Sequence, residues 1–203
     1  MSPAAAGYRL AAASPYSDGC KQPSARGTAG TAPETLPVTF RLRAAEAGDV
    51  ASIHSLILAL AEFEELTHLV TATEADLQSA LFGPHSRSEA VVAISGEDDP
   101  AAGEVVAFAL FFHNYSTFLG RAGLYLEDLF VRPSHRRRGI ARALLRRLAA
   151  LAVERGCGRF EWSVLDWNAG AIAFYEGLGA KVLPDWRIVR MTGDPLRALA
   201  GER

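Results

Sequence analysis

Residues 125–141 read Tyr-Leu-Glu-Asp-Leu-Phe-Val-Arg-Pro-Ser-His-Arg-Arg-Arg-Gly-Ile-Ala, an apolar strand that carries Glu127 and runs into a basic helix start. Apolar residues then recur at helical spacing, at Ile140, Leu144, Leu148 and Leu151. The first N–H groups of a helix lack partners within it, and together with the helix dipole they favour an anion. Gly139 and Ala141 let the backbone approach a pyrophosphate without a bulky side chain between them. The stretch therefore predicts a phosphate-binding helix start beside a strand carboxylate.

Residues 135–138 have a simpler interpretation as a solvated basic turn or a nuclear address. The apolar strand directly before them favours the phosphate site instead. Neither G-x-x-x-x-G-K-[ST] nor G-x-G-x-x-G occurs in the sequence, so a P-loop or Rossmann nucleotide site has no support.

The composition is that of a single globular domain, with 203 residues of which 49% are hydrophobic. A net charge of −2 gives no overall sign of a nucleic acid or membrane partner. No apolar run approaches the roughly 18 residues of a membrane span. Cys20, Cys157 and five scattered histidines have no metal-ligand spacing. We expect a cytoplasmic protein without a metal.

The first 37 residues differ in composition from the rest of the chain. They are rich in Ala, Ser, Gly, Thr and Pro and have no sustained apolar period, which predicts a disordered extension. Their low acid content also fits a plastid or mitochondrial transit peptide, which is the alternative. Residues 38–203 are predicted to form the folded domain.

Strand and helix signals alternate along that domain. Strands are expected at residues 38–42, 90–94, 105–112, around Tyr125, at 159–165 and at 181–191, the last interrupted by Pro184. Helices are expected after an N-cap at Asp49, after a capping box at residues 73–76, from 141 to 154, and from 168 to 178. In the first of these helices one face carries Ile53, Leu56, Ile57 and Leu60. This pattern predicts a three-layer α/β (α+β) domain on a mixed sheet.

The central strand, the Arg-x-x-Gly-x-Ala pattern at residues 136–141 and the helix after it resemble the GNAT family of N-acetyltransferases over about residues 38–196. Trp167-Asn168 and Phe174-Tyr175 follow at matching separations. Residues 61–64, 125–128 and 164–168 resemble the diamine acetyltransferases, and residues 66–69, 111–115 and 186–194 resemble their thialysine-type and plant ornithine-type members. The resemblance implies a mixed, mainly antiparallel sheet flanked by helices. It also implies a homodimer that acetylates small amines with acetyl-CoA.

Transfer of an acetyl group to an amine requires the neutral amine, and a carboxylate can assist the loss of the proton. Strict strand alternation puts two sets of residues on opposite faces: Tyr125, Glu127, Leu129 and Val131, and Leu126, Asp128 and Phe130. By resemblance Glu127 faces the substrate, binding the amine and accepting its proton directly or through water. A sheet carboxylate paired with an arginine is the alternative for Glu127, and Asp128 is expected to be structural.

Tyr175 matches the family's general acid, which protonates the departing CoA thiolate. A phenol with an ordinary pKa near 10 stays protonated at neutral pH and can fill that role. Judged without the resemblance, Phe174 and Tyr175 would be core residues of a helix.

The resemblance also assigns residues to the two substrates. Acetyl-CoA is expected to contact Leu129, Phe130, Val131, Arg136, Arg137, Arg138, Gly139, Ile140, Ala141, Arg142, Asn168, Gly170 and Ala171. The amine is expected to contact Phe63, Glu64, Glu127, Glu161, Trp162 and Ser163.

Four alternatives remain open at this point. Acetylation through Cys157 would replace direct transfer, although this residue follows the far end of the helix from the phosphate site. Spermidine or spermine could be the acceptor, or a protein amine could be. A non-catalytic module that binds acyl-CoA would need a degraded site.

Overall fold

The computed structural model describes residues 40–201, so the extension predicted for residues 1–37 lies outside the described residues. The strands are β1 (Phe40–Ala44), β2 (Ser88–Ser95), β3 (Val105–Ser116), β4 (Arg121–Val131) and β5 (Arg159–Trp162). The helices are α1 (Val50–Phe63), α2 (Glu74–Phe82), α3 (Ile140–Glu154), α4 (Ala169–Glu176) and α5 (Gly193–Leu199). Short 3-10 turns occupy Ala47–Asp49, Thr67–Leu69 and Pro133–His135. None of the described helices is long and apolar enough to cross a bilayer.

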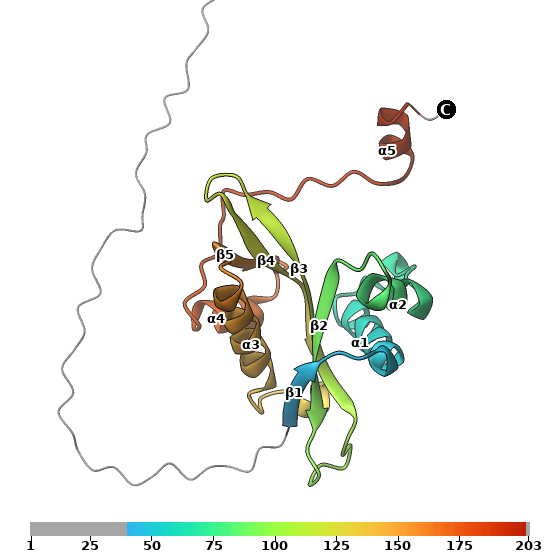
Figure 1. The fold of residues 1–203 in the computed structure, drawn as a ribbon, viewed down its shortest axis with the longest axis vertical. Helices are drawn as coiled ribbons and strands as arrows, with labels where there is room; N and C mark the ends of the chain where they lie inside the picture. Colours follow the sequence, from blue (N-terminus) through green and yellow to red (C-terminus); the bar gives the residue numbers. More distant parts are fainter. Residues whose placement is uncertain (1–39, 202–203) are drawn as a thin grey trace, which may run out of the picture. The chain divides into compact units, whose positions relative to one another are not determined.

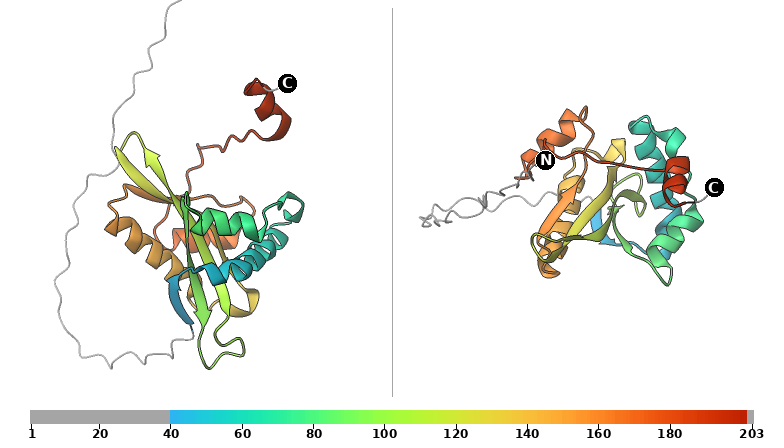
Figure 2. Two further views of the ribbon diagram at one scale, coloured as in Figure 1. Left: turned by 45° about the vertical axis from the view of Figure 1, so that its right-hand side comes forward. Right: turned by 90° about the horizontal axis from the view of Figure 1, so that it is seen from above.

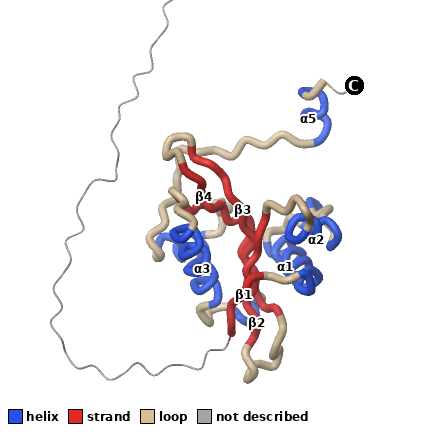
Figure 3. Tube along the Cα trace, in the orientation of Figure 1, coloured by secondary structure: helices blue, strands red, loops and turns tan. Residues whose placement is uncertain are grey.

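The strands form one sheet in the order β1-β2-β3-β4-β5 (Figure 1). Each neighbouring pair is antiparallel except β4 and β5, which are parallel. Helices α1 and α2 cover one face and α3 covers the other, as the tube in Figure 3 and the view from above in Figure 2 show. The predicted mixed, mainly antiparallel sheet between helices is confirmed.

Helix α3 packs its predicted apolar face on the sheet. Ile140, Leu144, Leu148 and Leu151 are all buried in one core cluster with Leu124 and Leu126 of β4. Burial of this many aliphatic side chains is the main stabilising contribution on this face. The helix start predicted to bind phosphate is therefore held firmly against the sheet.

The opposite face has a separate core formed by α1, α2 and the sheet. Ile53 and Leu56 of α1 are buried there with Phe108 and Phe130 of the sheet.

The capping box before α2 is confirmed, since Thr73 accepts from the Asp76 N–H and Asp76 accepts from the Thr73 N–H.

Asp49 stands at the N-cap of α1, but its side chain does not cap that helix. Its carboxylate instead accepts hydrogen bonds from the Arg43 guanidinium at 2.5 and 2.8 Å and from the Glu46 N–H at 2.7 Å. Asp49 is therefore at the predicted N-cap position but does not form the predicted capping hydrogen bond, because its carboxylate pairs with the Arg43 guanidinium.

Strand β4 contains a bulge at Glu127. Leu110 is paired with Asp128 and Phe111 with Leu126, so Glu127 has no partner on β3. An inserted residue reverses the alternation of side chains beyond it. Leu126 accordingly lies in the α3-side core and Phe130 in the α1-side core. The predicted strict alternation along this strand was wrong.

The C-terminal part of the domain differs most from the prediction. Strand β5 ends at Trp162 rather than at residue 165, and residues 181–191 form no strand. Instead the chain leaves the body after α4, runs extended and ends in α5 (Figure 1). All residues from 181 to 201 are exposed.

Candidate active site

The carboxyl-terminal half of β4 has an open edge. Parallel pairing with β5 covers only Gly123–Leu126, opposite Arg159–Trp162. Beyond Leu126 no described strand lies on that side of β4, so the backbone edge at residues 127–131 is available to a ligand. Leu129, Phe130 and Val131, predicted to bind the donor, all lie on this stretch.

The loop from β4 to α3 has a backbone shape suited to an anion. Arg137 and Gly139 both have left-handed conformations, with φ of 63° and 82°. Gly139 is the N-cap of α3, and no side chain caps the helix start. A loop that alternates left-handed and right-handed residues turns successive N–H groups toward one concavity. The N–H groups of Ile140, Ala141 and Arg142 follow directly, so the loop fits a pyrophosphate.

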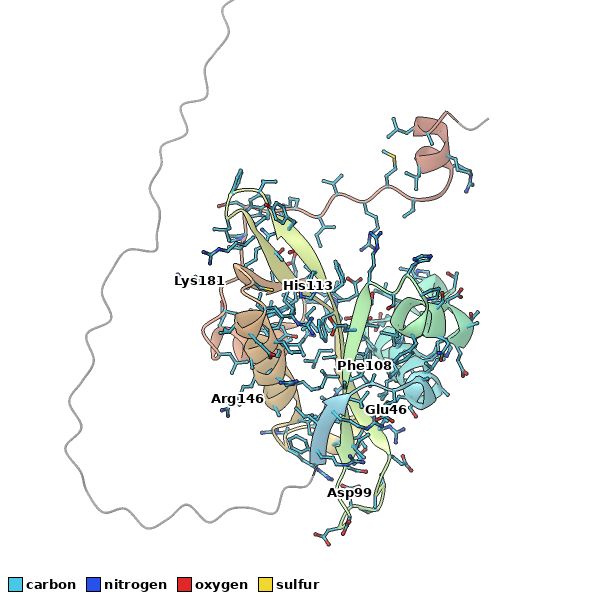
Figure 4. The ribbon with its side chains drawn as sticks, viewed as in Figure 1. Glu46, Asp99, Phe108, His113, Arg146 and Lys181 are labelled. Atoms are coloured by element: carbon cyan, nitrogen blue, oxygen red, sulfur yellow. The ribbon has the colours of Figure 1, made fainter. Side chains whose placement is uncertain are left out.

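Asp99, in the turn between β2 and β3, holds this loop in place (Figure 4). Its buried carboxylate accepts from Arg138 at 2.5 Å, lies 3.2 Å from Nε2 of His135, and accepts from the Ala101 N–H at 2.9 Å. The Ala101 N–H and the two side chains lower the pKa of Asp99 to about 2. The charge of Arg138 is thus already paired within the protein.

We expect Asp99→Asn to destabilise the fold in a pH-dependent way. A carboxyl with a depressed folded pKa stabilises the fold above its unfolded pKa of about 4, and that contribution is lost as pH falls toward 2. The difference in unfolding free energy between wild type and variant should therefore be constant above about pH 5 and shrink below pH 4. Urea denaturation across this pH range measures it.

Asp98→Asn is the matched control, because Asp98 is in the same turn and forms no ion pair within residues 40–201. A wild-type advantage over Asp99→Asn that persists undiminished at pH 2 would contradict the assigned role of the Asp99 carboxylate.

The Arg136 side chain points away from the phosphate loop. Its guanidinium carbon lies 4.8 Å from the centre of the Phe63 ring and 5.3 Å from that of Phe130, and Nε donates to the Val131 carbonyl at 3.1 Å. These cation–π contacts join the end of α1 to β4. The Arg136 side chain therefore supports the acceptor side of the site, and only its backbone is placed for the predicted donor contact.

Three carboxylates interact at the bulge. Asp128 is largely buried, and burial together with the charges of Glu127 and Glu64 raises its pKa to about 6. Burial also raises the pKa of Glu64. Glu127 is exposed in the free protein. The expectation that Asp128 is only structural rested on strict alternation, and the bulge removes that basis.

Tyr175 lies on α4 and contacts β5. Its ring packs edge-on against Trp162 of β5 at 5.1 Å between centroids. Burial, and then the Glu64 carboxylate, raise the pKa of the Tyr175 phenol. The Glu64 carboxylate thus raises the pKa of both Asp128 and Tyr175.

A pocket of about 300 Å³ adjoins these groups and is lined by Phe63, Glu64, Glu65 and Trp167. The Phe63 and Trp167 rings are 5.8 Å apart, which connects the end of α1 to the loop before α4. The structure thus places the predicted substrate residues Phe63 and Glu64 beside a cavity. The structure adds Trp167 to this lining, and the signal for it in the sequence is its position directly before Asn168 in the family motif.

The three predicted substrate residues at the end of β5 have different surroundings. Glu161 accepts from Asn114 at 2.7 Å and is 3.2 Å from Arg159, so its charge is already paired. Ser163 Oγ lies 2.9 Å from the Tyr125 hydroxyl. Trp162 supports Tyr175. Glu161 is therefore already paired in the free protein, and its contact with the amine stays a prediction.

The residues at the start of α4 are held by a cap. Asn168 accepts from the Ala171 N–H at 3.1 Å, and Gly170 has open space around its Cα.

Cys157 lies after the far end of α3 and packs against the core on that side. Among the residues that the structure describes, no group of three or more His, Cys, Asp or Glu side chains could hold a metal.

Two known proteins are similar to this chain over most of their length. L-ornithine N5-acetyltransferase NATA1 of Arabidopsis thaliana is 37% identical over 220 residues, covering 87% of this chain and 96% of the relative. Thialysine N-epsilon-acetyltransferase of Mus musculus is 38% identical over 169 residues, covering 79% and 97%.

The fold also matches solved structures. An integron cassette protein from the mobile metagenome of V. cholerae superposes with a TM-score of 0.66 at 24% identity, covering 80% of this chain and 98% of that one.

The profile of the acetyltransferase (GNAT) family matches residues 51–180. Members of this family transfer an acetyl group from acetyl-CoA to amines. The chain therefore belongs to the GNAT family of acetyltransferases.

Proposed function

We propose that this acetyltransferase moves the acetyl group of acetyl-CoA directly to a primary amine of a small diamine or basic amino acid, such as ornithine, thialysine or 1,3-diaminopropane. The observation that carries the proposal is the set of three interacting carboxylates, Glu64, Glu127 and Asp128, of which Glu64 also acts on the phenol of Tyr175. Carboxylates in a partly buried site favour a cationic acceptor. The two relatives are named as acetyltransferases of L-ornithine and of thialysine, and both of these substrates carry a basic side chain of the proposed kind.

The donor lies along β4 and ends at the start of α3. The backbone of residues 129–131 holds the pantetheine and the thioester oxygen, and the N–H groups of residues 137–142 hold the pyrophosphate. Asn168, Gly170 and Ala171 border it from α4.

Transfer needs the acceptor nitrogen to lose two protons and the departing sulfur to gain one. The ammonium of the acceptor gives its proton to Asp128, whose pKa of about 6 makes it a stronger base than an ordinary aspartate by about two orders of magnitude. The neutral nitrogen then attacks the thioester carbon, a C–N bond forms and the C–S bond breaks. Tyr175 donates its phenolic proton to the departing thiolate, and the second proton of the attacking nitrogen restores the phenol as the amide forms.

Glu127 and Glu64 bind the cationic ends of the acceptor. Glu127 is exposed at the bulge, where it can meet an incoming ammonium, and Glu64 lines the pocket next to Phe63. An acceptor with two polar ends suits this arrangement, because one amine reacts at Asp128 and the second polar group reaches the pocket.

A side-by-side assay of ornithine, thialysine, 1,3-diaminopropane and spermidine tests the substrate class. We expect kcat/KM to be higher for one of the three short acceptors than for spermidine, because the pocket beside Glu64 is small, about 300 Å³. A preference for spermidine would overturn this ranking.

Two further reactions distinguish the other classes. A lysine-containing peptide used better than any small amine would indicate a protein acetyltransferase. Hydrolysis or binding of acetyl-CoA without transfer to any amine would indicate an acyl-CoA-binding module. Either result would contradict the proposal.

A further inference from the structure

The pocket proposed for the acceptor lies at the end of α1 and is lined by Phe63, Glu64, Glu65 and Trp167. We call it the acceptor pocket. Two of the four lining residues are carboxylates, two are aromatic and none is basic. Glu64 is half-buried and Glu65 is exposed. The pocket therefore offers a ligand two negative charges and two aromatic rings.

The backbone of Glu65 has an unfavourable conformation for a glutamate. Its φ is 59°, in the left-handed region that residues with a Cβ adopt only at a conformational cost. The Leu66 N–H donates to the Ala61 carbonyl at 2.8 Å, and the Glu65 N–H donates to the Glu62 carbonyl at 3.1 Å. This is the Schellman ending of a helix, with Glu65 at the position where glycine is usual. The fold of α1 alone would favour glycine there.

The charge of Glu65 is unfavourable at this place as well. The C-terminal end of a helix carries the negative end of its dipole, and α1 has no basic residue in its last turn. Glu62 and Glu64 add two more negative charges to the same end. Neither Glu64 nor Glu65 forms an ion pair within residues 40–201. This end of α1 therefore attracts a cation.

The aromatic walls of the acceptor pocket also suit a cation. Phe63 and Trp167 are 42% and 57% exposed, and the faces of aromatic rings attract positive charge. The Arg136 guanidinium stacks on the Phe63 ring at 4.8 Å, and its Nε donates to the Val131 carbonyl. Arg136 takes part in no ion pair among the described residues, so the carboxylates of the pocket are left to a ligand.

We propose that Glu65 is a specificity-determining residue, which selects acceptors whose second end is an ammonium group. This selection rests on the proposed function, because it concerns the amine that enters the acceptor pocket. One ammonium of the acceptor reacts at Asp128, and the other lies among Glu64, Glu65 and the Trp167 ring. A neutral far end leaves the two carboxylates uncompensated, and a far end that carries only a carboxylate is repelled. In ornithine and thialysine the α-ammonium group meets this requirement.

Pairs of acceptors that differ only in the second ammonium group test the selection. The pairs are 1,3-diaminopropane with propylamine, and ornithine with 5-aminopentanoate. We expect Glu65→Gln to lower kcat/KM about tenfold for the two acceptors that have the second ammonium group, and not to lower it for the two that lack it. Glu62→Gln is the matched control, because Glu62 lies at the same helix end but does not line the pocket. It should leave the ratio within each pair unchanged.

Glu65→Gly separates the role of the charge from the strain of the backbone. Glycine adopts the left-handed conformation without a Cβ clash, so the thermal midpoint of unfolding should rise by about 2–4 °C. The same variant should nevertheless lose about tenfold in kcat/KM for the acceptors with a second ammonium group, as Glu65→Gln does. A gain in stability combined with a loss of selectivity is the result expected of a residue kept for its contact with the substrate.

Three outcomes of the acceptor assay would count against this role. Equal losses with all four acceptors in Glu65→Gln would show that the residue only shapes the pocket. No loss with any acceptor would show that its carboxylate is merely solvated. Both results would overturn the inference and leave the proposed function intact. A wild-type protein that acetylates none of the four acceptors would instead contradict the proposed function, and the inference with it.

Discussion

Tyr175→Phe should lower kcat by about 10²–10⁴-fold, or roughly 3–5 kcal/mol in activation free energy, while acetyl-CoA still binds. The change removes only the hydroxyl group, because a phenylalanine ring can keep the edge-on contact with Trp162 at 5.1 Å. Burial and the Glu64 carboxylate raise the pKa of the phenol, so wild-type Tyr175 carries its proton throughout the neutral range. Without the hydroxyl group of Tyr175, the CoA thiolate must leave unprotonated.

Steady-state kinetics and calorimetric titration with acetyl-CoA measure the two effects separately. Tyr115→Phe is the matched control, since Tyr115 is an exposed tyrosine on β3 outside the candidate site. It should leave kcat within about twofold. Unchanged turnover in Tyr175→Phe would reject this residue as the acid, and an equal loss in both variants would point to a general effect on stability.

The sequence predicted the parts of the fold where periodicity and capping agree. The apolar face of α3, with Leu144 and Leu148, is buried as expected, because its spacing fits only one period. The capping box at Thr73 marks the start of α2 because its side-chain hydrogen bonds are local and do not depend on the rest of the molecule.

Long-range features could not be predicted in this way. The bulge at Glu127 depends on the register between β3 and β4, which no pattern within β4 reveals. The pairing of Asp99 with Arg138 joins residues that are distant in sequence, and no local pattern around Arg138 indicates this partner. Residues 181–191 have a strand pattern but pair with no strand among residues 40–201. A β-strand forms only where its backbone N–H and C=O groups can pair with a neighbouring strand, whatever the pattern of its side chains.

Asp128→Asn should lower kcat/KM by about 10²–10⁴-fold and remove the acid limb of its pH profile. Wild-type Asp128 accepts the proton only when it is ionised, and its pKa is about 6 because of burial and the charges of Glu127 and Glu64. Wild-type kcat/KM should therefore fall about tenfold for each pH unit below 6. An ordinary aspartate would cause this fall near pH 4.

Glu127→Gln distinguishes the two neighbouring carboxylates. Removing the charge of Glu127 relieves a repulsion that raises the pKa of Asp128, so the acid limb should move below pH 6 while the KM for the amine rises. Glu62→Gln, on the exposed surface of α1, serves as the control and should leave the limb in place. If the limb near pH 6 instead persists in Asp128→Asn and disappears in Glu127→Gln, then Glu127 is the base. In that case the bulge would serve to aim Glu127 at the amine, and the buried Asp128 would act only through its charge.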